Sequence, residues 1–304
     1  MTTRLVLVSL CLPWFCLAET TWSPSRWFWR RATRDVPSEG FHNPLDKGGS
    51  MLTQIPVTFP EGLGEPLNVI ISGNSDEQVL KETETDGGLL NFFLSFGFSS
   101  ECLGQHMGSN QAANLGDGHG YLNETAVIRW NYGDPALGAC KESIEGGNHF
   151  RYWVQNGPEG NSGSIFMAVS YELPISLGHD IVANGYNFGR DWLVGNMTNT
   201  TVPTAELTNT TTYTTNTFWG GYTYLSEIKY VSGLLSNSSD GINHYITVGL
   251  NGTNAIDGLV AVITTKITAR PASSSAIWTA TPFSLWTCIF IIFVSSASAV
   301  IAYV

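Results

Sequence analysis

The apolar residues of this 304-residue chain fall into short runs that predict a β-sheet with a helix near its start. Each run is rich in β-branched or aromatic residues and is bounded by Gly, Asn or Pro, which is the pattern of a strand. The predicted strands of this first group are residues 67–71, 125–130, 148–154 and 164–170. Residues 88–97 have helical spacing instead, and Gly97 would end that helix.

The second half of the chain continues this pattern after a polar interruption. Residues 196–217 are rich in Thr and Asn and predict an exposed loop. Residues 221–235, 242–250 and 257–268 follow. The last two alternate or run apolar and are separated by a Gly/Asn turn at 251–254, which predicts antiparallel hairpins. The expected fold is α+β, a mixed β-sheet packed with two or so helices and followed by antiparallel β-hairpins. The pattern leaves open whether the hairpins extend the first sheet.

Both ends of the chain are apolar and predict processing or membrane segments. Residues 1–18 combine Arg4, an apolar run and small residues before Glu19, the pattern of a secretory signal peptide. Residues 271–304 combine small residues, a short spacer and an uncharged apolar tail. That layout predicts a GPI-attachment signal, and a retained single transmembrane helix is the alternative. No Lys or Arg follows the apolar tail, as one would after a stop-transfer segment, which favours the lipid anchor.

Four parts are expected between these ends. They are an N-terminal arm or pro-segment (19–50), an α/β core (51–195), a glycosylated Thr/Asn-rich loop (196–220) and a β-hairpin region that completes the ectodomain (221–270). The formal net charge of −11 argues against a nucleic-acid partner, which would require a basic face. We expect the chain in the secretory pathway, and finally at the extracellular face of the plasma membrane or in the cell wall.

The cysteines and sequons agree with an oxidising, glycosylating compartment. Cys11 and Cys16 lie in the signal segment and Cys288 lies in the tail. Cys102 and Cys140 remain and are predicted to form a disulfide bond. N-glycosylation sequons begin at Asn123, Asn196, Asn199, Asn209, Asn237 and Asn251, which together predict a glycoprotein.

Ionisable side chains are concentrated between residues 147 and 195. Strand alternation places His149, Arg151 and Trp153 on one face of a strand, and Phe150, Tyr152 and Val154 on the other. The candidate catalytic residues are His149, Arg151, His179, Arg190 and Asp191. One hypothesis is an anion or polar-ligand site built from the two histidines and two arginines. The alternative, which we favour, is an Arg–Asp bridge that holds a helix on the sheet.

Other polar clusters are assigned no chemistry. The Gly/Asn-rich loop 104–120 contains Asp117 and His119, which we interpret as a solvated turn rather than a metal site. Glu142 and Glu145 would serve a glycosidase only if they faced each other across a groove, and a solvated turn is again preferred. The sequence contains no GxSxG motif of a serine hydrolase, no HExxH motif of a zinc protease and no nucleotide-binding P-loop. We therefore assign no metal and no cofactor.

The order of these segments resembles the LssY C-terminal domain family, a module of uncharacterised function. The matching positions are residues 67–73, 89–98, 149–153, 165–170 and His179 through Arg190-Asp191. Residues 184–195 are also similar to a group of uncharacterised fungal secreted proteins. Asn187 and Gly189 replace an acidic pair of the family, so the resemblance implies no carboxylate chemistry there.

Two functions follow as expectations. The first is a glycosylated cell-surface protein with a binding or structural role at the cell wall, not an enzyme, whose partners are cell-wall glycans and the membrane. Its exposed aromatic rings would stack on sugars, with Tyr152, Trp153, Trp192 and Trp219 as candidates. The alternative is a secreted hydrolase with a His/Arg/Asp site within residues 149–191.

Overall fold

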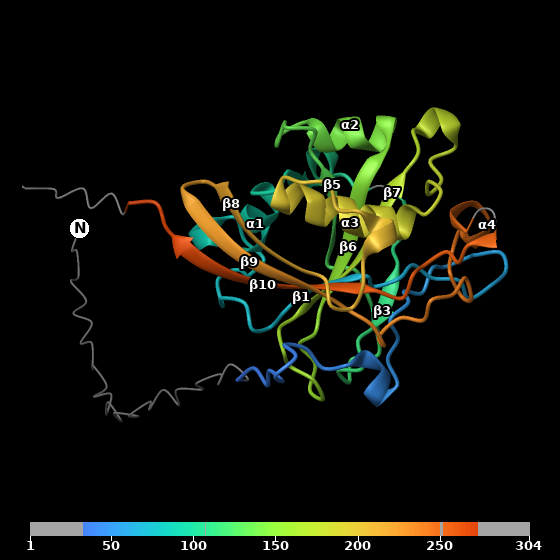
Figure 1. The fold of residues 1–304 in the computed structure, drawn as a ribbon, viewed down its shortest axis with the longest axis horizontal. Helices are drawn as coiled ribbons and strands as arrows, with labels where there is room; N and C mark the ends of the chain where they lie inside the picture. Colours follow the sequence, from blue (N-terminus) through green and yellow to red (C-terminus); the bar gives the residue numbers. More distant parts are fainter. Residues whose placement is uncertain (1–32, 107, 250–251, 273–304) are drawn as a thin grey trace, which may run out of the picture. The chain divides into compact units, whose positions relative to one another are not determined.

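A computed structural model describes residues 33–106, 108–249 and 252–272. From Arg34 onward these residues belong to one compact unit, built on an eight-stranded sheet in the order β2-β5-β6-β7-β1-β10-β9-β8 (Figure 1). The strands of this sheet are β1 (Val69–Ile71), β2 (Phe98–Ser100), β5 (Ala126–Trp130), β6 (Gly147–Val154), β7 (Ile165–Glu172), β8 (Thr212–Trp219), β9 (Tyr222–Val231) and β10 (Val260–Ala269). A separate two-stranded sheet pairs β3 (Ala112–Asn114) with β4 (Tyr121–Asn123).

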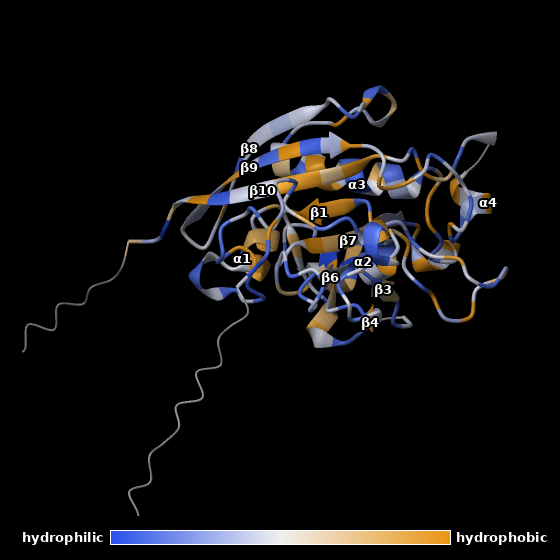
Figure 2. Cartoon of the chain, turned by 90° about the horizontal axis from the view of Figure 1, so that it is seen from below, coloured by the Kyte–Doolittle hydropathy of each residue, from blue (hydrophilic) through white to orange (hydrophobic). Residues whose placement is uncertain are grey.

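The two faces of the large sheet bury different sets of side chains because neighbouring residues of a strand point in opposite directions. On β6, Phe150 and Tyr152 belong to one apolar cluster, and Trp153 belongs to another. The predicted alternation along this strand is therefore confirmed. Figure 2 shows a second contrast, between the hydrophobic colour of the central strand β1 and the paler, more polar colour of the edge strand β8.

Helices cover the face that contains Phe150. Helix α1 (Leu89–Leu94) contributes Phe92 and Phe93 to that cluster, and α3 (Gly185–Thr198) packs along β6 and β7 (Figure 1). Gly97 has a φ of +89°, which ends the α1 segment as predicted. The opposite face is covered in part by the segment from Phe41 to Met51 and by β3.

The hairpin region continues the first sheet. β10 pairs in parallel with β1, and the other strand pairs of the large sheet are antiparallel. Residues Val260 to Ile263 are buried, as expected for a strand with neighbours on both sides. The predicted fold class, a mixed α+β fold with antiparallel hairpins, is confirmed.

Three predicted segments differ from the structure. The Thr/Asn-rich stretch 196–217 is not a continuous loop, because its first residues complete α3 and its last residues form β8. Residues 242–250 are not a strand: the short helix α4 (Tyr245–Val248) lies there, with Ile242 and Val248 buried together. Helix α2 (Gly138–Glu145) replaces the solvated turn expected around Glu142. Short alternating runs fit one helical turn as well as a strand, so the sequence pattern could not separate them.

Among the described residues, no helix is long and apolar enough to cross a membrane. The predicted signal peptide (1–18) and the predicted anchor or transmembrane segment (271–304) lie outside the described residues, apart from positions 271 and 272.

Candidate functional site

Arg190 and Asp191 form a buried ion-pair network between α3 and the sheet. Arg190 is 0 % exposed, and its guanidinium donates two hydrogen bonds to Asp191, at 2.7 and 2.9 Å. Two more, both of 2.8 Å, go to Asp257, and a fifth of 2.7 Å goes to the carbonyl of Leu259. Asp191 also accepts a hydrogen bond from the hydroxyl of Tyr230 at 2.8 Å.

This network uses all five donors of the guanidinium. Burial opposes the charge of Arg190, but the hydrogen bonds to Asp257 and Asp191 outweigh it and raise the pKa of the guanidinium. No donor is left for a ligand, so the contacts agree with the favoured structural interpretation of the Arg–Asp pair. The long side chain of Arg190 folds back onto the carboxylate of the next residue, Asp191.

His149 and His179 meet on the other face of the sheet, together with two glutamates. His149 Nδ1 lies 3.8 Å from Glu142 Oε1 and 3.4 Å from Glu172 Oε2. His179 Nε2 lies 3.1 Å from the same oxygen of Glu172. These four side chains come from α2, β6, the end of β7 and the loop after the 3₁₀-helix Ile175–Leu177. We call them the His–Glu cluster.

Each residue of the His–Glu cluster presents a buried polar atom without a hydrogen-bond partner. The atoms are Glu142 Oε1, His149 Nδ1, Glu172 Oε2 and His179 Nε2. Among the described residues, one atom each from Glu142, His149 and Glu172 lie within 4.8 Å of one another, as the donors of a metal site would. Buried polar atoms are normally paired, so three such atoms in one group, with a fourth on His179 beside Glu172, require an explanation.

Burial dominates the electrostatics of the cluster. It raises the pKa of the Glu172 carboxyl to about 9, and the neighbouring Glu142 adds to the effect. Burial also raises the pKa of Glu142, although Arg129 opposes it through a 2.8 Å hydrogen bond. The pKa of His149 is held well below its usual range by burial and by the charge of Arg129, so the imidazole is neutral at pH 7.

Arg151 lies on the same face of β6 but belongs to a different set of contacts. Its guanidinium forms an ion pair with Glu124, which also accepts a hydrogen bond from the backbone of Gln111 at 2.8 Å. The hypothetical anion site is therefore divided: the histidines join two glutamates, Arg151 pairs with Glu124, and Arg190 lies on the opposite face. The groups nearest to the histidines are two carboxyl groups, whose oxygens are ligands for a metal cation rather than for an anion.

Sequence reasoning missed Glu142 and Glu172. Glu142 was expected in a solvated turn with Glu145, but it is fully buried, whereas Glu145 is exposed and pairs with Lys141 at 3.5 Å. Their separate environments rule out a facing pair of carboxylates. Glu172 has no local motif, and only the pairing of β6 with β7 brings it beside His149.

Asp117 was expected in a solvated turn, and this prediction is wrong. Its side chain is buried and accepts hydrogen bonds from the backbone of Gly157 at 2.9 Å and of His119 at 3.1 Å. It organises two loops rather than facing water.

Gly189 is the position where α3 comes closest to the backbone of β7. A Cβ atom at this position would lie 2.7 to 3.0 Å from the backbone of Ser170 and Tyr171 on β7. Helix and strand touch through their backbones, so a glutamate in place of Gly189 would push α3 away from the sheet.

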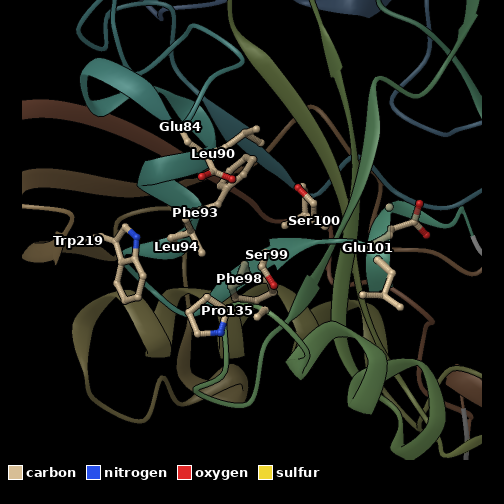
Figure 3. Close-up of a pocket in the computed structure, with 14 residues that line it drawn as sticks. Glu84, Leu90, Phe93, Leu94, Phe98, Ser99, Ser100, Glu101, Pro135 and Trp219 are labelled. Atoms are coloured by element: carbon tan, nitrogen blue, oxygen red, sulfur yellow. The ribbon is translucent and has the colours of Figure 1, made fainter.

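A cleft of about 390 Å³ lies at the β2 edge of the sheet. Trp219 stands at one end and Glu101 at the other, with Ser99, Ser100 and Pro135 between them (Figure 3). Of the aromatic candidates for ligand stacking, Tyr152 and Trp153 are buried, Trp192 is half-buried, and Trp219 is 39 % exposed. Trp219 alone of these four combines clear exposure with a place in this cleft.

The predicted disulfide bond between Cys102 and Cys140 is present. It joins the 3₁₀-helix Cys102–Gly104 to α2, between Glu101 of the cleft and Glu142 of the His–Glu cluster. The cleft and the cluster are further connected through Arg129, which lies 2.8 Å from Glu142 and 3.6 Å from Glu101. No family model, curated protein or solved structure matches this chain.

Proposed function

We propose that this chain is a glycosylated extracellular surface protein that binds cell-wall glycans through the cleft beside Trp219. The cleft is the observation that carries this proposal. A half-exposed indole ring offers a flat apolar surface to the C–H groups of a sugar, and Ser100 and Glu101 offer oxygens to its hydroxyl groups. A site with one aromatic wall and a few polar groups is typical of small-ligand recognition.

The proposed extracellular location is supported by the disulfide bond and by the position of the sequons. Disulfide bonds persist in oxidising compartments. Exposed asparagines begin the sequons at Asn123, Asn199, Asn209 and Asn237. Attachment to the membrane through a GPI anchor, with a transmembrane helix as the alternative, and the relationship to the LssY C-terminal domain family remain parts of the same proposal.

Replacing Trp219 by Ala should weaken glycan binding, because the stacking surface is lost. The measurement is isothermal titration of the secreted full chain with β-glucan, chitin and mannan oligosaccharides. We expect an affinity about 5- to 13-fold weaker in the variant, from the loss of about 1–1.5 kcal/mol of ring contact. Binding that is equal in the variant and the parent would contradict the cleft as the site.

Phe218 provides the matched control for this experiment. It is the preceding residue of β8, is 64 % exposed and does not line the cleft. Phe218→Ala should bind the oligosaccharides as the parent does. If both variants lose binding equally, the edge strand as a whole has been disturbed and the specific role of Trp219 is refuted.

Glycan occupancy should differ between the sequons. The Nδ2 atom of Asn196, to which a glycan would be attached, is buried in the fold. We therefore expect Asn123, Asn199, Asn209 and Asn237 to carry glycans in the secreted protein and Asn196 to be the least occupied of these five. Peptide mapping by mass spectrometry before and after N-glycosidase treatment measures this. Absence of any glycan on the secreted chain would contradict the proposal.

The hydrolase alternative receives less support. Its arginine and aspartate, Arg190 and Asp191, are used in structural contacts, and they lie across the sheet from His149. Its histidines lie in the His–Glu cluster, for which a different role fits better.

A further inference from the structure

We propose that Glu142, His149, Glu172 and His179 bind a divalent transition-metal ion of the zinc class, and that this ion holds α2 and the loop after β7 on the sheet. This inference is independent of the glycan cleft, so either can fail without the other.

Three distances within the cluster are close to those of a tetrahedral metal site. Ligand atoms that lie about 2.0–2.2 Å from a zinc ion in tetrahedral geometry lie roughly 3.3–3.6 Å from each other. His149 Nδ1 lies 3.4 Å from Glu172 and 3.8 Å from Glu142, and these three residues form one group within 4.8 Å. His179 stands beside this group, 3.1 Å from Glu172. Two of the four ligands, Glu142 and His149, are almost completely buried, so their free lone pairs cannot be satisfied by bulk water.

Hydrogen bonding within the cluster does not account for these atoms. His179 Nε2 is 3.1 Å from Glu172 Oε2, and neither atom has a partner in hydrogen-bond geometry. The two atoms are close without pointing at each other, as expected when both point at a common centre.

The surroundings orient the ligands in the way that metal sites require. The second oxygen of Glu142 accepts a hydrogen bond of 2.8 Å from Arg129. The Nε2 atom of His149 lies 3.4 Å from the hydroxyl of Ser170 on β7, which leaves Nδ1 for the metal. A histidine that uses one ring nitrogen for a metal commonly uses the other for such a contact.

The donor set selects the class of metal. Two imidazoles and two carboxylates suit Zn²⁺ and related transition metals, whereas Ca²⁺ and Mg²⁺ prefer oxygen ligands alone. Two carboxylates neutralise the charge of a divalent ion, which lowers the cost of burying it. The His179 side chain is 28 % exposed and provides the route by which the ion enters. His179, which adjoins Glu172, would complete a tetrahedron with the three grouped ligands when its side chain turns toward the ion, the arrangement of structural zinc sites.

The test uses the full chain purified from a secretory host and stripped with a chelator. Zinc binding is measured by competition with a chromophoric chelator, and stability is measured by thermal unfolding. We expect one zinc ion per chain and a midpoint raised by about 5–10 °C at a zinc concentration 100 times Kd. Cobalt should bind in place of zinc and give the intense visible absorption of a tetrahedral site.

His179→Ala and Glu172→Gln are the informative variants, because both positions retain some exposure and removal of the metal ligand leaves little cavity. Each should weaken zinc binding at least about 100-fold, and each should abolish the cobalt absorption and the thermal shift. His119→Ala is the matched control: this histidine is 40 % exposed and also adjoins an acidic residue, Asp117, at 3.6 Å. It should bind zinc and cobalt as the parent does.

Three outcomes would overturn the proposal. The first is a parent protein whose midpoint does not change with zinc, cobalt or manganese and which binds none of them. The second is binding that persists unchanged in both His179→Ala and Glu172→Gln. The third is binding that is lost in His119→Ala, which would place the metal in the loop 104–120 instead.

Discussion

Arg190→Met should lower the free energy of unfolding by about 3–5 kcal/mol, the largest effect that we expect from a single substitution. The methionine fills much of the space but leaves Asp191, whose side chain is 0 % exposed, without its cation. Asp257, which is 27 % exposed, loses the same partner. Urea titration followed by tryptophan fluorescence measures the change.

Two controls separate the buried network from charge in general. Lys141→Met removes an exposed cation that pairs with Glu145, and it should change stability by less than about 0.5 kcal/mol. Adding Asp191→Asn and Asp257→Asn to Arg190→Met should restore part of the loss, because the cost arises from unpaired buried carboxylates. A loss below about 1 kcal/mol for Arg190→Met alone would contradict a structural role and reopen the ligand-site hypothesis.

Removing the disulfide bond should be nearly as costly. The bond closes a loop with a sequence separation of 38 residues, and the chain-entropy model gives about 4 kcal/mol for its loss. Both cysteines are half-buried, so replacing them by alanine adds only a small cavity term. We expect the variant Cys102→Ala/Cys140→Ala to unfold at a much lower urea concentration than the parent.

Reduction of the parent protein tests the same bond without mutation. Dithiothreitol should lower the midpoint of the parent to that of the double variant and should leave the variant unchanged. The bond holds α2, which carries Glu142, so reduction should also weaken zinc binding. An equal midpoint for oxidised parent, reduced parent and double variant would show that the bond contributes nothing to stability.

The local patterns of the sequence predicted much of the secondary structure. The sequence predicted the strand at Ala126–Trp130, the alternation along β6 and the helix before Gly97. Each of these features depends on periodicity and on nearby turn residues. The errors fell where periodicity is weak. Residues 245–248 form only one helical turn, and the Thr-rich strand β8 at the sheet edge has few apolar residues to mark it.

Only part of the candidate site could be predicted from the sequence. His149 and His179 stood out because histidine is rare in this chain, and the preferred interpretation of Arg190 with Asp191 needed only their adjacency. Their partners are distant in sequence: Asp257 lies 67 positions after Arg190, and Glu172 lies opposite Gly147 on the neighbouring strand. A single sequence contains no signal for such pairs.

The sequence by itself therefore determined the fold class, the disulfide pairing and the faces of β6, all of which follow from local periodicity or from counting cysteines. Only the tertiary structure decided that β10 joins β1 in one sheet, that Arg190 belongs to a saturated ion-pair network, and that two glutamates meet two histidines. The physical reason is that strand pairing and helix packing bring together residues far apart in the chain, and burial then sets the charge and chemistry of the groups that meet.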